Sequence, residues 1–249
     1  MIIEFVVLIA LYRIFTNPEL SAFYFAVIGL NFIGLYLTAS FSAFGALCCA
    51  VTVMLYLKRK RRYALFFVIS VLLLVGLLAA FPLLLPRGSD AIDHTLSQRL
   101  SIWTASLQGI ERHLFFGQGV GAYQMIYEQF GGYKTYHCHN LILDALLNFG
   151  VAGFAAIGIY TGAQVKFLYL RFRNNICPDM NILLTAAAAA VLVHGMTDVT
   201  ILWIQTAALF TIIYSSTGIA SGYIEKSVRR PAFLPEYAAK SNAGVYLKD

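Results

Sequence analysis

Six long apolar runs constrain this chain more than any other feature of its sequence. A helix needs about 20 apolar residues to cross the hydrocarbon core of a bilayer, whereas barrel strands alternate and are about ten residues long. With 59% hydrophobic and 12% charged residues, the chain is also too apolar for an ordinary soluble domain. We therefore predict an all-α fold, a polytopic transmembrane helix bundle of about six or seven spans. The opening stretch 1–16, interrupted by Glu4 and Arg13, is a short or truncated span. The six runs lie near residues 18–38, 40–57, 63–86, 141–165, 181–200 and 202–222.

The basic residues indicate how these helices cross the membrane. Lys and Arg in short loops are retained on the cytoplasmic side, so the basic cluster at 58–62 lies inside. The run 63–86 then crosses outward, and 141–165 returns to a second basic cluster. Topology thus explains the net charge of +6, and we predict no nucleic-acid partner. The predicted domains are N-terminal transmembrane helices at 1–86, an extracytosolic loop at 87–139, C-terminal transmembrane helices at 140–222 and a cytoplasmic tail at 223–249.

The extracytosolic loop has the pattern of a folded helical cap on the membrane surface. Its apolar residues recur at spacings of four and three, which is typical of an amphipathic helix. Thr95 and Gln98 resemble a capping box at the helix start, and Gly117 can end it. A second short helix is predicted over 122–130, after a glycine-rich turn that lacks the Lys of a phosphate-binding loop. The apolar stripe consists of Leu96, Leu100, Trp103, Leu107, Ile110 and Leu114.

This loop contains four basic residues, although basic residues generally stay on the cytoplasmic side. They are Arg87, Arg99, Arg112 and Lys134. Binding an anion would explain them. Guanidinium groups bind phosphate in bidentate fashion, so a lipid-linked diphosphate is a natural ligand. We predict Arg99, Arg112 and Arg87, together with His137, as substrate-binding residues. The alternative for Arg112 is a contact with lipid headgroups or a pair with Glu111.

The segment Tyr136-His137-Cys138-His139-Asn140 lies where the loop re-enters the bilayer. An imidazole at this place can accept a proton at neutral pH, so His139 is a candidate base, with His137 and Asn140 beside it. The alternative is that the histidines only anchor the following helix. We predict no metal, because three ligands so close in sequence cannot easily surround one tetrahedral ion. Nothing pairs the four cysteines, so neither a disulfide nor a zinc site is predicted.

His194 and Asp198 lie four residues apart in an apolar run, which predicts that they share one helix face. Ionisable residues inside a span are costly and are therefore functional candidates. Because this run crosses outward, Asp198 is expected near the same surface as His139, where it could orient a catalytic group. Helix packing is the alternative, and a small transporter is a further one, although the repeated, broken helices of that class are missing.

Several motifs follow one another in a recognisable order. Arg99 and Trp103 lie on the loop helix, a glycine-rich turn follows at 111–121, and His139-Asn140-Leu141 precedes a helix start at 148–153. Over about residues 37–222, this ordered set resembles the O-antigen ligase and O-antigen polymerase superfamily. The resemblance corresponds to the C-terminal half of that family, whose members usually have several more helices in front.

The resemblance implies an inverting glycosyltransferase that needs neither a metal nor another cofactor. Such an enzyme moves a glycan from undecaprenyl diphosphate to an acceptor sugar hydroxyl at the outer face of the bacterial plasma membrane. The acceptor is a lipid A core sugar in ligases and another lipid-linked repeat unit in polymerases, which we favour here. By this resemblance His139 is the acceptor-activating residue, and Arg99 holds the diphosphate.

One departure leaves an alternative open. The family commonly has Arg after a Thr-x-Ser motif, and here Thr38-Ala39-Ser40 is followed by Phe41. Unless Arg99 or Arg87 takes the place of this arginine, the chain lacks the residue that binds the donor phosphate. The alternative function is therefore a non-catalytic or truncated membrane protein that binds a polyprenyl-linked glycan.

Overall fold

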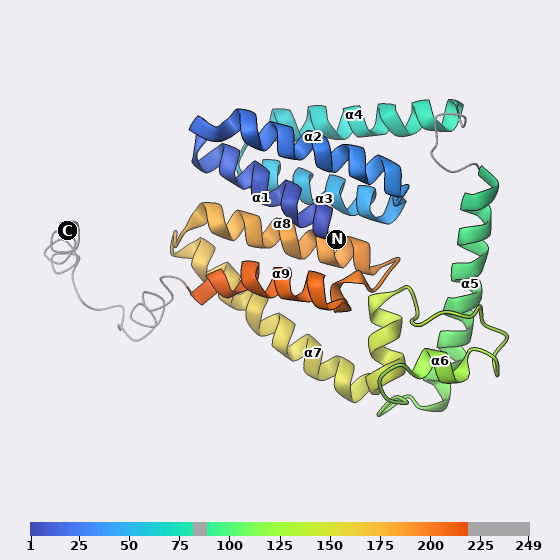
Figure 1. The fold of residues 1–249 in the computed structure, drawn as a ribbon. Coiled ribbons are helices and arrows are strands. Elements are labelled where there is room, and N and C mark those ends of the chain that lie inside the picture. The colour runs from blue at the N-terminus through green and yellow to red at the C-terminus, as the bar shows by residue number, and fades with distance from the viewer. Residues whose placement is uncertain (82–88, 219–249) are drawn as a thin grey trace, which may run out of the picture.

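The computed structural model describes residues 1–81 and 89–218, and in these ranges the chain forms helices joined by turns (Figure 1). Most of the helices lie side by side in a bundle, and α5 and α6 form a cap at one end of it. The predicted all-α fold with membrane-spanning helices is confirmed. Arg87 and the predicted tail at 223–249 lie outside the described residues.

The core of the bundle is formed by α1 (Ile2–Thr16), α3 (Phe41–Leu57) and α8 (Pro178–Gly195). Phe5 and Leu8 of α1 are fully buried. Small side chains on α8, including Ala187, let α3 approach closely, as is usual between helices in membranes. The stretch 1–16, predicted as a short or truncated span, is therefore a regular helix at the centre of the bundle.

The periphery of the bundle exposes large apolar side chains, as expected for helices that face lipid. It consists of α2 (Ser21–Thr38), α4 (Arg61–Ala80), α7 (Leu141–Arg173) and α9 (Ile204–Ser215). Four helices of the described chain are long and apolar enough to cross a bilayer, namely Pro18–Thr38, α4, α7 and α8. The other apolar helices, α1, α3 and α9, have 15, 17 and 12 residues, fewer than the roughly 20 of a straight crossing.

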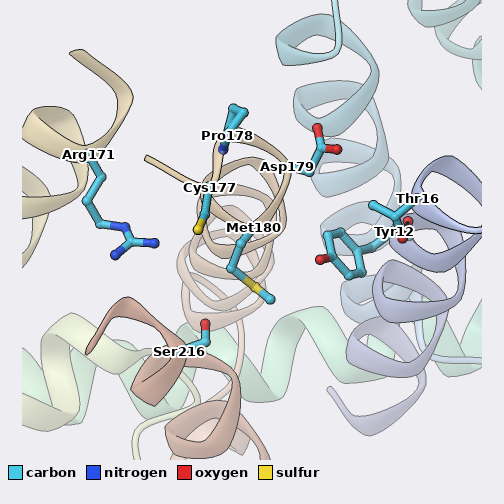
Figure 2. A pocket seen from close by; sticks show the side chains of 8 residues that line it. All are labelled: Tyr12, Thr16, Arg171, Cys177, Pro178, Asp179, Met180 and Ser216. Atoms are coloured by element: carbon cyan, nitrogen blue, oxygen red, sulfur yellow. Dashed lines mark hydrogen bonds between the residues drawn. The ribbon is translucent and has the colours of Figure 1, made fainter. Parts of the chain in front are cut away.

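The predicted cytoplasmic basic residues gather at the end of the bundle opposite the cap. Lys58, just after α3, forms a 2.7 Å ion pair with Asp179 at the start of α8. Lys58 and Lys60 also lie over the ring of Phe15 at the end of α1. A cavity of about 260 Å³ opens at this end, and Figure 2 shows the side chains that line it. They are Tyr12, Thr16, Arg171, Cys177, Pro178, Asp179, Met180 and Ser216.

In the cap, α5 (Ser89–Arg112) runs crosswise to the bundle helices, and the short α6 (Ala122–Ile126) packs beside it (Figure 1). Two predicted boundaries are wrong. Thr95 lies inside α5 and does not begin it, and α6 ends at Ile126, four residues before Phe130. The buried face of α5 coincides only in part with the predicted stripe. Ile110 of the stripe is buried and Trp103 packs against the same cluster, whereas Leu96, Leu100 and Leu107 are exposed. Ile102 and Ala105, which lie outside the stripe, complete the buried face.

The connection between cap and bundle is a kink in α7 at Gly150, whose φ of 64° and ψ of −170° are accessible essentially only to glycine. A kink leaves two carbonyls and two amides of the helix without their usual partners. The turn that contains Gly117 satisfies all four through its own backbone. The hydrogen bonds run from Gln118 N to Leu147 O (2.9 Å), Gly119 N to Asn148 O (2.9 Å), Val151 N to Leu114 O (2.8 Å) and Ala152 N to Phe115 O (3.0 Å).

Two glycines permit this close approach of two backbones. A Cβ at Gly150 would lie 2.4 Å from the carbonyl of Phe115, and a Cβ at Gly117 would lie 2.5 Å from the carbonyl of Asn148. Such distances are impossible without displacing one backbone from the other. The glycine-rich stretch is therefore a tight turn, as predicted, and it fixes the cap to α7.

Candidate functional site

Two histidines of the cap meet one aspartate of the bundle. The Nδ1 atom of His139 lies 3.3 Å from Oδ1 of Asp198, and Nε2 of His137 lies 3.9 Å from the same oxygen. The two imidazole rings contact each other edge to face, with centroids 4.3 Å apart. On its other side, Nε2 of His139 lies 3.3 Å from the hydroxyl of Thr135. The predicted proximity of His139 and Asp198 is thus present in the structure.

The loop that carries the histidines is held by buried polar side chains of α7. Asp144 is buried, and its carboxylate accepts hydrogen bonds from the amide of Cys138 (3.1 Å) and from Nδ2 of Asn148 (2.9 Å). Asn148 in turn accepts from the amide of Ala122 at the start of α6 (3.1 Å). His139 itself adopts a φ of 48°, a left-handed conformation that is uncommon outside glycine. The hydrogen bonds of this loop and the left-handed backbone at His139 therefore define where its imidazole begins.

Asn140 connects this loop to the end of the bundle. Its side-chain oxygen caps α7 by accepting from the amides of Ile142 and Leu143, both at 3.0 Å. Its Nδ2 donates to the carbonyl of Met196 at 2.9 Å, in the turn between α8 and α9. This turn carries Asp198, so Asn140 joins the two halves of the cluster.

Asp198 does not lie on the helix of His194, as the spacing predicted, because α8 ends at Gly195. The amide of Asp198 still donates to the carbonyl of His194 (3.0 Å), and the Asp198 carboxylate accepts from the amide of Val199 (2.8 Å). His194 is buried in the bundle and its Nδ1 lies 2.7 Å from the carboxylate of Glu4, which is fully buried. His194 thus belongs to a separate polar pair inside the bundle.

The charges of the cluster are unequal. Burial alone would raise the pKa of the Asp198 carboxyl, but the imidazole of His139 and the amide of Val199 outweigh it and lower this pKa below its ordinary value. Burial, with the neighbouring imidazole of His139, lowers the pKa of His137 below 6.5. Asp198 is therefore ionised and His137 neutral at pH 7.

The two candidate arginines that the structure describes, Arg99 and Arg112, are not brought together. Arg99 donates to the hydroxyl of Ser42 in the first turn of α3, at 3.5 Å, and so lies against the outer end of the bundle. Arg112 lies over the ring of Phe130 at 4.6 Å from its centroid. Thirteen positions on one helix separate Arg112 from Arg99, or about 20 Å, too far for both to bind the same diphosphate.

A cavity of about 400 Å³ opens at this end of the bundle, with Asp198 in its wall. One wall is apolar and comes from the start of α1 and from α2, whereas the other is polar and comes from the α8–α9 turn and the start of α9. The lining residues are Met1, Ile2, Ile3, Leu35, Thr38, Ser40, Ala43, His194, Asp198, Thr200, Trp203, Gln205 and Thr206.

A comparison with protein families matches residues 24–158, more than half of the chain, to the O-antigen ligase family. The chain belongs to the O-antigen ligase family. Searches of curated proteins and of solved structures found no match. Membership, together with the apolar helices, makes the chain a multi-pass membrane protein of glycosyltransferase type.

The part of the chain that matches the family extends from α2 to the middle of α7. It therefore contains Arg99, His137 and His139, whereas Asp198 lies beyond it. In the structure, Asp198 contacts the histidines from the turn after α8.

The structure brings together a different set of potential metal ligands from the one weighed in the sequence. Donor atoms of His137, His139 and Asp198 lie within 4.8 Å of one another, so a third ligand is available without Cys138. Cys138 is fully buried in the core of the cap, where burial raises the pKa of its thiol far above the ordinary value. The absence of a metal in the reaction stays a prediction.

Among the buried polar residues that sequence reasoning missed are Glu4, Asp144 and Asn148. A usable signal exists for two of them. Asn140, Asp144 and Asn148 are spaced four apart, which puts them on one face of an otherwise apolar helix. No comparable pattern surrounds Glu4, whose partner His194 is 190 positions away.

Proposed function

We propose that this protein transfers a glycan from undecaprenyl diphosphate to a sugar hydroxyl at the outer face of the bacterial plasma membrane. The observation that carries the proposal is the contact of His139 with Asp198 beside an open cavity. A base paired with a carboxylate, at a surface where a lipid-linked substrate can arrive, suits the activation of a hydroxyl. Family membership adds the reaction class.

In the proposed step, His139 removes the proton from the acceptor hydroxyl as its oxygen attacks the anomeric carbon of the donor glycan. The new bond forms between that oxygen and the anomeric carbon, while the bond from this carbon to the phosphate oxygen breaks. Undecaprenyl diphosphate leaves with the electron pair, and direct displacement inverts the anomeric centre. Asp198 stabilises the imidazolium that forms at His139. No metal is required in this sequence of events.

Arg99 is proposed to hold the leaving diphosphate in place of the arginine that is missing after Ser40. Its guanidinium reaches Ser42, the residue after that position, and so supplies positive charge at the same end of α3. A guanidinium stabilises the growing negative charge on the leaving group through charge-assisted hydrogen bonds. Arg112, packed over Phe130, is left out of the step.

Orientation follows from the separation of charge along the bundle. The loops with Lys58 and Asp179 lie at the end opposite the cap, and short basic loops stay in the cytoplasm. The cap, its histidines and the cavity then face the extracytosolic side. A lipid-linked repeat unit is the acceptor we favour, with a lipid A core sugar as the alternative.

Replacement of His139 tests the proposal. His139→Ala in the native host is expected to abolish the surface-polysaccharide product, because general-base catalysis contributes on the order of 10²–10⁴ in rate. The exposed His113 on the same cap provides a matched control, and His113→Ala is expected to leave the product ladder unchanged. A full ladder from His139→Ala protein at normal expression would remove the assignment.

A non-catalytic glycan-binding protein is the second candidate, and Phe41 in place of the family arginine is the observation that favours it. Purified protein in lipid nanodiscs, given an undecaprenyl-diphosphate glycan and an acceptor, decides between the two. Binding without transfer supports the second candidate, and transfer supports the first.

A further inference from the structure

We propose that the cavity of about 400 Å³ beside Asp198 is a subsite for the acceptor sugar, in which Trp203 is the stacking platform and Thr200 and Gln205 bind hydroxyl groups. This inference rests on the proposed function and assigns to it the place of one substrate.

Asp198 is the residue that the cavity shares with the histidine cluster. Its Oδ1 lies 3.3 Å from Nδ1 of His139, and its side chain also lines the cavity. A ligand that contacts Asp198 from the cavity therefore lies next to the imidazole of His139. The hydroxyl of an acceptor must lie at this place, whereas a donor need not.

The polar wall of the cavity matches the chemistry of a sugar ring. A pyranose has an apolar C–H face and an edge of hydroxyl groups. Trp203 offers an indole that is 56% exposed, and an aromatic ring of this kind suits an apolar face that has a polar rim. Gln205, two residues further along the chain, offers an amide that can both donate and accept.

Thr200 adds the observation that points most directly to a ligand. Its buried hydroxyl has no hydrogen-bond partner among residues 1–81 and 89–218. A buried hydroxyl without a partner costs roughly 1–3 kcal/mol, and a ligand hydroxyl in the cavity would remove this cost. The neighbouring Thr206 differs, because its hydroxyl already donates to the backbone carbonyls of Thr200 and Trp203 and so shapes the turn.

A polyprenyl tail fits this cavity less well than a sugar. The apolar wall, with Ile3 and Leu35, could contact an isoprenoid chain. The opposite wall would then place Thr200, Gln205 and Asp198 against hydrocarbon, and unpaired polar groups are costly there. The polar residues of the lining thus favour a ligand that carries hydroxyl groups.

The chain contains two tryptophans, which makes binding directly measurable. Trp103→Phe leaves Trp203 as the only indole, and the purified full chain in nanodiscs is titrated with methyl hexopyranosides and, separately, with farnesol. We expect a saturable change in Trp203 emission with at least one hexopyranoside. Thr200→Val in the same background should weaken that binding by about tenfold, the loss expected for one hydrogen bond.

The reciprocal variant is the control. Trp203→Phe, which keeps Trp103 in the cap, should show no change in emission with the same sugars. The proposal is overturned if no hexopyranoside gives a saturable signal, or if farnesol gives one and the sugars do not.

A transfer assay separates this inference from the proposed function. Thr200→Val and Trp203→Ala are expected to raise the acceptor KM about tenfold and to leave the donor KM unchanged. If wild-type protein transfers glycan and both variants keep the wild-type acceptor KM, the subsite is wrong and the proposed function stands. If hexopyranosides bind but wild-type protein transfers nothing, the acceptor assignment is wrong together with the proposed function.

Discussion

His139 and Asp198 illustrate which residue contacts a sequence can and cannot give. Topology alone put both near one surface, since the run that contains Asp198 crosses outward and ends where the loop with His139 re-enters the bilayer. The pairing of Glu4 with His194 could not be foreseen in this way, because it depends on which of several helices packs beside α8. The burial of Cys138 likewise depends on the closure of the cap over it.

Asn140 is a positioning residue whose two roles can be separated. Asn140→Asp keeps an oxygen to cap α7 but loses the Nδ2 donor to the carbonyl of Met196, which lies 2.9 Å away. We expect thermal stability to change by less than about 1 kcal/mol, because the cap is retained. The kcat of glycan transfer should fall about tenfold without a change in donor KM, since His139 and Asp198 lose their common support.

Asn174 at the other end of α7 gives a matched control for this change. It donates from Nδ2 to the carbonyl of Leu170 at 2.8 Å, so Asn174→Asp removes the same kind of bond far from the site. Both variants are compared by transfer kinetics and by thermal unfolding in detergent. Equal kcat values for Asn140→Asp and wild type would show that the bond to Met196 does not position the base.

At the scale of elements, the helices follow from composition, and their boundaries depend on tertiary contacts. Apolar runs identified α2, α4 and the bundle part of α7. The stripe on α5 was only partly correct, because periodicity cannot distinguish an apolar face that packs in the cap from one that stays exposed. The kink of α7 at Gly150 could not be predicted either, because the turn whose backbone forms hydrogen bonds with the kinked segment lies about 30 residues earlier.

Gly150→Ala tests the importance of this kink. The added Cβ would lie 2.4 Å from a backbone carbonyl and would require a φ of 64°, so we expect a loss of at least about 1–3 kcal/mol from backbone strain alone. Gly158→Ala in the same helix meets no atom within 4 Å and should leave the stability nearly unchanged. Chemical unfolding in detergent, with proteolysis of the cap as a second readout, compares the two. Similar stability of both variants would contradict the role of the kink.

For the whole molecule, the decisive expectation is that the cap and the turn between α7 and α8 lie on opposite sides of the membrane. Native Cys138 cannot report on the cap because it is fully buried, whereas Tyr136 beside it is 77% exposed. Tyr136→Cys, in a background with Cys177→Ser, should react with a membrane-impermeant maleimide in intact cells. Cys177 of the wild-type chain is exposed and should react only after permeabilisation.

Labelling of Cys177 from outside intact cells, with Tyr136→Cys protected, would invert the topology. The cluster of His139 and Asp198 would then face the cytoplasm, and transfer at the outer surface would be excluded. Equal labelling of both positions in permeabilised cells serves as the control for expression and accessibility.

The modest size of the chamber beside Asp198 bears on how long a product this protein can make. A space of about 400 Å³ is within the range of small-ligand sites and holds a short fragment. If the protein elongates a polymer, as we propose, a growing polysaccharide extends beyond this cavity into the surrounding water. A cavity of this size then contacts only the terminal units, so the distribution of polymer lengths would be set by the balance between elongation and release or by a separate protein.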